Sequence, residues 1–191
     1  MSTELRPAFI LIVVMGLILG VIYPVIVTGI ARTVFPMQAQ GSLVYRNGGL
    51  IGSHLIGQAF SDPKYFWGRP SATSPQPYNG LASSASNFGA LNPDLSLRIQ
   101  ADLKRLREAS GDAKHPVPAD LVEASGSGLD PEVSLAAALY QVSRVARARG
   151  LDPKILEELV RTRAVGSLFG FLGEARINVL DLNLALDDIH E

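Results

Sequence analysis

A chain of 191 residues has room for one domain and some additional segments. Its formal net charge of −1 excludes the strongly basic surface typical of nucleic-acid binding, and the absence of cysteine excludes a disulfide scaffold and a thiol nucleophile. Apolar residues make up 47% of the chain, and they are concentrated near the N-terminus.

The first predicted element is a membrane-spanning helix. No charged residue occurs from Pro7 to Ala31, between Arg6 and Arg32. A helix of this length measures roughly 37 Å, enough to cross a hydrocarbon core of about 30 Å. A cleaved signal peptide is the alternative, but the apolar run is longer than a signal core and has bulky residues in its second half.

The short segment before this helix predicts the orientation. A head of a few residues with one arginine favours a cytoplasmic N-terminus, and long domains cross the membrane largely regardless of their charge. We therefore predict a cytoplasmic segment 1–6, a transmembrane helix 7–33 and an extracytoplasmic domain 34–191.

Three residues of the predicted helix suggest packing against other helices. Gly16 and Gly20 are four residues apart, a spacing that lets a second helix approach closely, although glycine is common enough in spans for chance to explain it. Pro24 removes one backbone hydrogen bond and should bend the helix.

The beginning of the soluble domain is predicted to be a hairpin followed by a long loop. Asn47-Gly48 lies between the short apolar runs 42–46 and 50–51, as in a tight β-hairpin. Prolines and small polar residues dominate 59–92, and a loop of that length inside a compact domain is often functional.

Three Asx–Pro pairs predict the starts of three helices, because each places a capping side chain before proline at the first helical position. The pairs are Asn92-Pro93, Asp130-Pro131 and Asp152-Pro153. The second helix should end near Gly150 and the third should span about 153–163. Between the first two helices, residues 117–124 are predicted to form a strand or an extended edge.

The last element, residues 178–187, fits two structures. Leucines alternate as in a strand, but Asn178 followed by Asp181 is typical of a helix N-terminus, and we favour a helix. The predicted fold class is α+β, with a single N-terminal transmembrane helix followed by a small mixed domain.

The sequence contains no recognisable catalytic or metal-binding pattern. The three histidines, His54, His115 and His190, are too far apart for the common metal-ligand spacings. Ser71 has no neighbouring base in the sequence, so a serine nucleophile would need partners brought in by the fold. Exposed arginines of the predicted helices are expected to be solvated rather than to bind anions; these are Arg144, Arg147, Arg149, Arg161 and Arg163.

The stretch 65–80, YFWGRPSATSPQPYNG, is the most unusual part of the chain. Its aromatic residues and arginine are typical anchors of protein–protein contacts, which suggests a surface that docks on a partner. The alternative is that Tyr65, Phe66 and Tyr78 fold inward and hold the loop on its own domain.

Residues 65–73, YFWGRPSAT, resemble the signature of the C subunit of the Kdp potassium-transporting P-type ATPase. Further blocks resemble the same family in the same order, so the resemblance covers nearly the whole chain. These blocks are 41–43, 55–58, 78–79, 86–87, 121–130, 144–149 and 178–187.

The resemblance implies an accessory subunit that hydrolyses nothing itself, in a bacterial inner membrane. Its implied partners are a channel-like potassium-binding subunit, a P-type ATPase catalytic subunit, a small stabilising peptide and the surrounding lipid. The residues that would dock on partners are Gly16, Gly20, Pro24, Tyr65, Phe66, Arg69, Tyr78 and Asn79. A membrane-anchored extracytoplasmic hydrolase and a stand-alone binding module are the alternative functions.

The family is also described as raising the affinity of the pump for ATP. A nucleotide site on this chain would be argued at Ser125, Gly126, Gly128 and Gln141. However, the turn 125–130 lacks the Lys-Ser/Thr ending of a phosphate loop, and an extracytoplasmic domain cannot contact cytoplasmic ATP. The chain is expected to have no cofactor of its own, and an effect on ATP affinity would arise by coupling through the membrane subunits.

Overall fold

A computed structural model describes residues 2–111 and 115–189. His190 therefore lies outside the described residues. The chain divides into two compact units, one up to Ile51 and one from Gly52 onward. The first contains a long apolar helix and the second is a mixed domain of helices and a small sheet, which confirms the α+β prediction.

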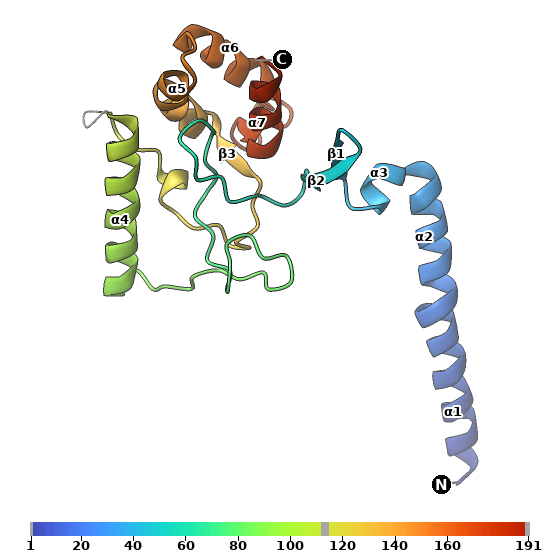
Figure 1. The fold of residues 1–191 in the computed structure, drawn as a ribbon. Helices are drawn as coiled ribbons and strands as arrows, with labels where there is room; N and C mark the ends of the chain where they lie inside the picture. The colour runs from blue at the N-terminus through green and yellow to red at the C-terminus, as the bar shows by residue number, and fades with distance from the viewer. Residues whose placement is uncertain (1, 112–114, 190–191) are drawn as a thin grey trace. The chain divides into compact units, whose positions relative to one another are not determined.

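The N-terminal unit begins with a continuous helical run, α1 (Ser2–Leu17), the π-helical turn η1 (Ile18–Ile22) and α2 (Tyr23–Val34) (Figure 1). The π-helical turn directly precedes Pro24, whose missing N–H cannot complete the regular ladder. The helix is therefore locally widened just before this proline. Residues Glu4–Val34 are long and apolar enough to cross a membrane.

A short helix and a hairpin follow. Helix α3 (Pro36–Ala39) leads to β1 (Leu43–Arg46) and β2 (Gly49–Ser53), which form a two-stranded sheet. Asn47 and Gly48 both have positive φ angles, 52° and 78°, as the tight turn between twisted strands requires. The predicted Asn-Gly hairpin is confirmed.

The described part of the second unit contains four α-helices, a 3₁₀ turn and a two-stranded antiparallel sheet. The elements are α4 (Pro93–Ser110), η2 (Ala119–Leu121), β3 (Glu132–Ser134), α5 (Leu135–Arg149), α6 (Pro153–Arg163), β4 (Arg176–Asn178) and α7 (Val179–Asp188). In the sheet Val133 is opposite Ile177. Residues 54–92 contain no helix or strand, so the predicted long loop is confirmed.

Two of the three predicted helix starts are confirmed, and one is wrong. Asn92 and Asp152 accept hydrogen bonds from the backbone two residues later and cap α4 and α6. Asp130 caps no helix, because Glu132 already pairs with Asn178 in the sheet and its amide is held by the Asp130 side chain. Helix α5 instead begins after Ser134, whose hydroxyl accepts from Ala137 N at 3.0 Å.

Of three further predictions of secondary structure, two are confirmed and one is wrong. Helix α7 confirms the helical interpretation of the last element, with Asn178 as its cap. The strand predicted at 117–124 is wrong, because this segment forms the turn η2. Leu121 and Val122 are both buried, whereas neighbouring residues of a strand would point to opposite faces. The end of α5 at Gly150, which adopts the left-handed conformation, is confirmed.

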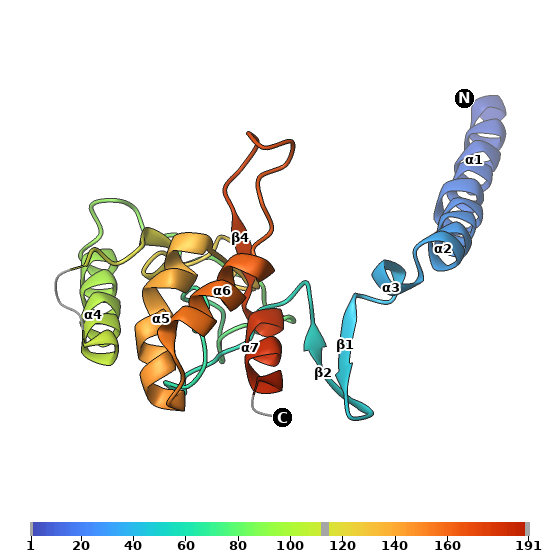
Figure 2. The same ribbon diagram turned by 90° about the horizontal axis from the view of Figure 1, so that it is seen from above.

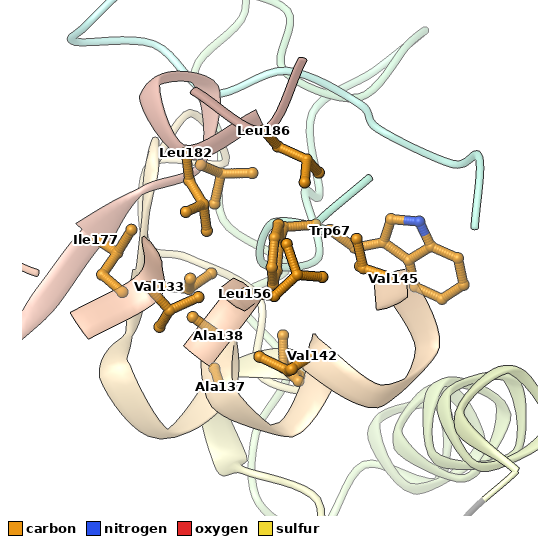
Figure 3. Packing of buried hydrophobic residues seen from close by; sticks show 14 of the residues in the cluster. Trp67, Val133, Ala137, Ala138, Val142, Val145, Leu156, Ile177, Leu182 and Leu186 are labelled. Atoms are coloured by element: carbon orange, nitrogen blue, oxygen red, sulfur yellow. The ribbon is translucent and has the colours of Figure 1, made fainter. Parts of the chain in front are cut away.

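The hydrophobic core lies among α5, α6, α7 and the β3–β4 sheet. Figure 3 shows its side chains packed in one cluster, with the ring of Trp67 at the edge. Phe66 and Trp67 come from the long loop, and Phe66 is completely buried. The core therefore depends on a segment without regular secondary structure, which must be fixed by other means.

Candidate functional site

The long loop is fixed by two buried side-chain amides. Asn183 of α7 accepts from the backbone N–H of Phe66 at 2.8 Å and donates to its carbonyl at 3.0 Å. Gln141 of α5 makes the same pair of bonds with Trp67, at 2.8 and 3.1 Å. The two amides thus replace the neighbouring strand that residues 66 and 67 lack. We call residues 62–80 the clamped loop.

Arg144 adds a buried cation to the same clamp. Its guanidinium donates to the carbonyls of Pro63 and Tyr65 and to Oε1 of Gln141. It also lies 3.9 Å from the ring centroid of Trp67, where the π electrons favour a positive charge. Burial lowers the pKa of Arg144 to about 10, with a further contribution from the nearby cation Arg105. The prediction that Arg144 is exposed is wrong: only 4% of the residue is accessible.

Tyr65 is held at the outer side of the clamp. Its hydroxyl donates to Oδ2 of Asp187 at 3.2 Å, and the guanidinium of Arg149 lies 4.9 Å from its ring centroid. Arg149 completes this contact by a 2.6 Å ion pair with Asp187. Arg149 is therefore a structural residue as well, and not a free cation for an external anion.

The second half of the clamped loop is attached to the turn at 125–130. Arg69 Nη1 is 3.0 Å from Asp130 Oδ2, and Ser71 Oγ donates to the carbonyl of Gly128 at 2.7 Å. A Cβ at Gly128 would lie 2.6 Å from Ser84 O and from Thr73 Cγ2, so the turn and the loop touch closely. The glycine-rich turn 125–130 therefore packs directly against the clamped loop and helps to fix its conformation.

Tyr78 closes the loop on itself. Its hydroxyl donates to the carbonyl of Arg69 at 2.6 Å, and its ring lies where a Cβ at Gly57 would collide, at 2.4 Å. Burial raises the pKa of Tyr78 to about 12, and the carboxylate of Asp130 adds to this effect. Asn79 donates from its side chain to Ser74 O at 3.0 Å, which keeps the tip of the loop in one conformation.

The residues at which a nucleotide site would be argued make contacts within the domain instead. Gln141 is 1% exposed, and both atoms of its amide have protein partners, including Ala137 O. Ser125 is buried and donates from its backbone to Pro70 O. Gly126 and Gly128 belong to the turn that packs on the clamped loop. Gln141, Ser125 and Gly128 are thus buried in the domain, whereas Gly126 is exposed.

The predicted docking residues are placed in two groups. Phe66 is fully buried, while Tyr65, Arg69, Tyr78 and Asn79 are partly exposed along the clamped loop. Inward folding of Tyr65, Phe66 and Tyr78 is therefore observed.

The other group belongs to the N-terminal helix. Gly16, Gly20 and Pro24 all belong to its apolar segment. A Cβ at either glycine would meet no atom within 4 Å, so this face offers a shallow surface to another helix.

The site has no arrangement that suggests catalysis. Among the described residues no group of three or more His, Asp or Glu side chains could hold a metal ion. The hydroxyl of Ser71 donates to a backbone carbonyl and accepts from Tyr78 N at 2.9 Å, so it is a structural group and not an activated nucleophile. His54 pairs with Asp181 at 2.9 Å, on α7.

Sequence reasoning missed Asn183 and the role of Gln141. A usable signal was present for Asn183, since it interrupts the apolar face formed by Val179, Leu182 and Leu186. A polar residue in the middle of such a face must find a buried partner. The sequence alone does not indicate which backbone segment this partner is.

Known proteins of one family are similar to this chain over nearly its whole length. The family model described as "KdpC: K+-transporting ATPase, c chain" matches residues 5–188. The Potassium-transporting ATPase KdpC subunit of Burkholderia orbicola (strain MC0-3) is 54% identical over 187 residues, covering 98% of this chain and 97% of the relative.

Two further KdpC subunits are similar to the same degree. Those of Methylococcus capsulatus (strain Bath) and Herminiimonas arsenicoxydans are each 54% identical, and they cover 98% and 100% of this chain. The match extends from the apolar helix through the clamped loop to α7 and confirms the resemblance seen in the sequence. The chain belongs to the KdpC family, the c chain of the K+-transporting ATPase.

Proposed function

We propose that this chain is the non-catalytic subunit of a bacterial potassium-uptake ATPase, anchored in the inner membrane by one helix. The observation that carries the proposal is the family match over residues 5–188, which includes the apolar helix. The N-terminus is cytoplasmic and the domain 34–191 is extracytoplasmic. Arg6 directly before the apolar segment supports this orientation.

The clamped loop prepares a docking surface for the channel-like potassium-binding subunit. Its backbone is fixed by Gln141, Asn183 and Arg144 before any partner arrives. A loop that is already ordered loses little conformational entropy on binding, which strengthens association. The partly exposed side chains of Arg69, Tyr78 and Asn79 form the outer side of this surface.

The N-terminal helix supplies the second contact of this subunit. The face with Gly16, Gly20 and Pro24 packs on helices of the same complex, which also contains the P-type ATPase subunit and a small stabilising peptide. Any influence on ATP affinity then passes through these membrane subunits by differential contacts in two states. The structural tasks of Gln141 and Ser125 support this route over a nucleotide bound to the chain itself.

The experiment is a steric block at the tip of the clamped loop. The side chain of Gln76 is exposed there, so Gln76→Trp adds bulk without disturbing the clamp. We expect tagged full-length chain to co-purify with the ATPase subunits, and Gln76→Trp to lower their yield and the potassium-stimulated hydrolysis of ATP. The matched control is Gln100→Trp on the exposed side of α4.

Two results would contradict the proposal. Wild-type chain that purifies without any ATPase subunit would exclude membership of the complex. Equal yields from Gln76→Trp and Gln100→Trp would exclude docking through the clamped loop.

A further inference from the structure

An exposed apolar arm connects α6 to β4. Residues 164–176 leave the domain and return to it, and Figure 2 shows this segment extending beyond the helices. Two bridges hold the arm together: Val165 with Arg176 at its base, and Leu168 with Leu172 near its tip. The base is fixed further by the β3–β4 pairing and by Arg176, whose Nε is 2.9 Å from Glu132 Oε2. We call residues 164–176 the aromatic arm.

The tip of the aromatic arm is unusually apolar for a surface. Phe169 is 80% exposed and Phe171 is 76% exposed, and Leu168 and Leu172 beside them are also exposed. Residues 164–173 include no charged side chain. An exposed apolar group of this kind marks a contact with another molecule more often than a free surface.

The backbone at Phe169 provides a second, independent observation. Its φ angle is +55°, a left-handed conformation that glycine adopts easily and a bulky residue adopts at a cost. The following residue, Gly170, also has a positive φ of 80°. A turn that places phenylalanine where glycine would be easier presents an aromatic ring at the tip, and such strain is typical of functional positions.

We propose that the aromatic arm inserts Phe169 and Phe171 into an apolar cleft on a membrane subunit of the same ATPase complex. The inference rests on the proposed function, because it requires that the chain be part of that complex. The cleft is lined by aliphatic or aromatic side chains and offers a hydrogen-bond acceptor at its rim. Aromatic side chains in such clefts supply much of the binding energy of protein interfaces.

A lipid surface fits the aromatic arm less well. Among the described residues the N–H of Phe169 has no protein acceptor, and the hydrocarbon core of a bilayer offers none, whereas an apolar cleft in a protein can provide one at its rim. Segments that lie on membranes also carry Lys or Arg beside their apolar residues. The arm has none between Arg163 and Arg176, and Glu174 lies within this interval.

A second copy of this chain is also a poorer occupant. A stable interface buries on the order of 800 Å² on each partner, more than a single narrow arm can supply. The same small contact is sufficient within a complex that the membrane helix already holds together, because the effective concentration of the partner is then high.

The first experiment identifies the occupant directly. A benzophenone amino acid replaces Phe169 in the full chain, and the assembled complex is illuminated in its membrane. We expect an adduct whose mass is that of this chain plus one membrane subunit of the ATPase. The same amino acid at Leu97, exposed on α4, gives the background. Adducts with lipid alone, an adduct of twice the mass of this chain, or no adduct above background would overturn the proposal.

The second experiment measures the contribution of the arm. Phe169→Ser combined with Phe171→Ser should weaken assembly at least about tenfold, since two aromatic side chains no longer leave water. Both residues are largely exposed, so the domain should unfold at the same denaturant concentration as the wild type. Leu97→Ser is the matched control and should assemble normally.

The outcomes separate this inference from the proposed function. Normal assembly of the double variant overturns the role of the aromatic arm and leaves the proposed function intact. Failure of the wild-type chain to assemble with any ATPase subunit overturns both.

Discussion

At the scale of single residues, hydrogen-bonded polar side chains hold the clamped loop in place. Tyr78 is an example, because its hydroxyl donates to Arg69 O while its ring fills the space above Gly57. Burial disfavours the charged phenolate, and the nearby carboxylate of Asp130 disfavours it further. The protonation of this one side chain is therefore coupled to the folded state of the loop.

Tyr78 should ionise near pH 12 in the folded protein, compared with 10 in the unfolded chain. Because the folded pKa is raised, the stability contributed by Tyr78 is complete below pH 10 and is lost as the pH rises towards 12. The two-unit difference corresponds to about 2–3 kcal/mol. A pH titration of the tyrosinate absorbance, run on the wild type and on Tyr78→Phe, measures this pKa. The rise in absorbance that the variant lacks should occur near pH 12. If that rise occurred near pH 10 while the protein was still folded, the assignment would be contradicted.

At the scale of secondary-structure elements, α5 and α7 act as the two halves of a clamp. Each contributes one amide, Gln141 or Asn183, that pairs with the backbone of the neighbouring residues Phe66 and Trp67. The helices are thereby joined through the loop as well as through the apolar core. Removing one amide would leave a buried N–H and a buried carbonyl without partners, which costs about 1–3 kcal/mol for each group.

Gln141→Leu should therefore lower the free energy of unfolding by about 2–4 kcal/mol in the absence of nucleotide. Leucine has a similar volume, so the loss arises from the unpaired backbone of Trp67 and from the Arg144 guanidinium that loses an acceptor. Urea unfolding of the full chain in mild detergent measures the change. Ser143→Leu, at an exposed position of the same helix, should change it by less than about 0.5 kcal/mol. Equal effects of the two substitutions would show that Gln141 does not hold the loop.

Elements with a local signal could be predicted from the sequence, and elements set by distant contacts could not. The Asn47-Gly48 hairpin and the helices capped by Asn92 and Asp152 need only neighbouring residues, and they were predicted correctly. Asp130-Pro131 has the same local pattern, but pairing of β3 with β4 takes precedence over it. The clamp joins residues 74 and 117 positions apart, so its partners become visible only in the folded structure.

At the scale of the whole molecule, the side of the membrane on which the domain lies decides what the domain can contact. The family match and the long apolar helix fit a single-pass membrane subunit. The proposed orientation puts the N-terminus in the cytoplasm and the domain outside the membrane. In that orientation the clamped loop and the aromatic arm would reach the outer surface of membrane subunits, and the domain would have no direct contact with cytoplasmic ATP. The central claim is therefore a claim about topology.

Labelling of single cysteines tests this claim most directly, because the natural chain contains no cysteine. Ser96→Cys places a thiol on the exposed side of α4, and Glu4→Cys places one before the apolar segment. In intact spheroplasts a membrane-impermeant maleimide should label the cysteine at position 96, and should label that at position 4 only after the membrane is permeabilised. Labelling at position 4 in intact spheroplasts, with position 96 protected until permeabilisation, would contradict the account.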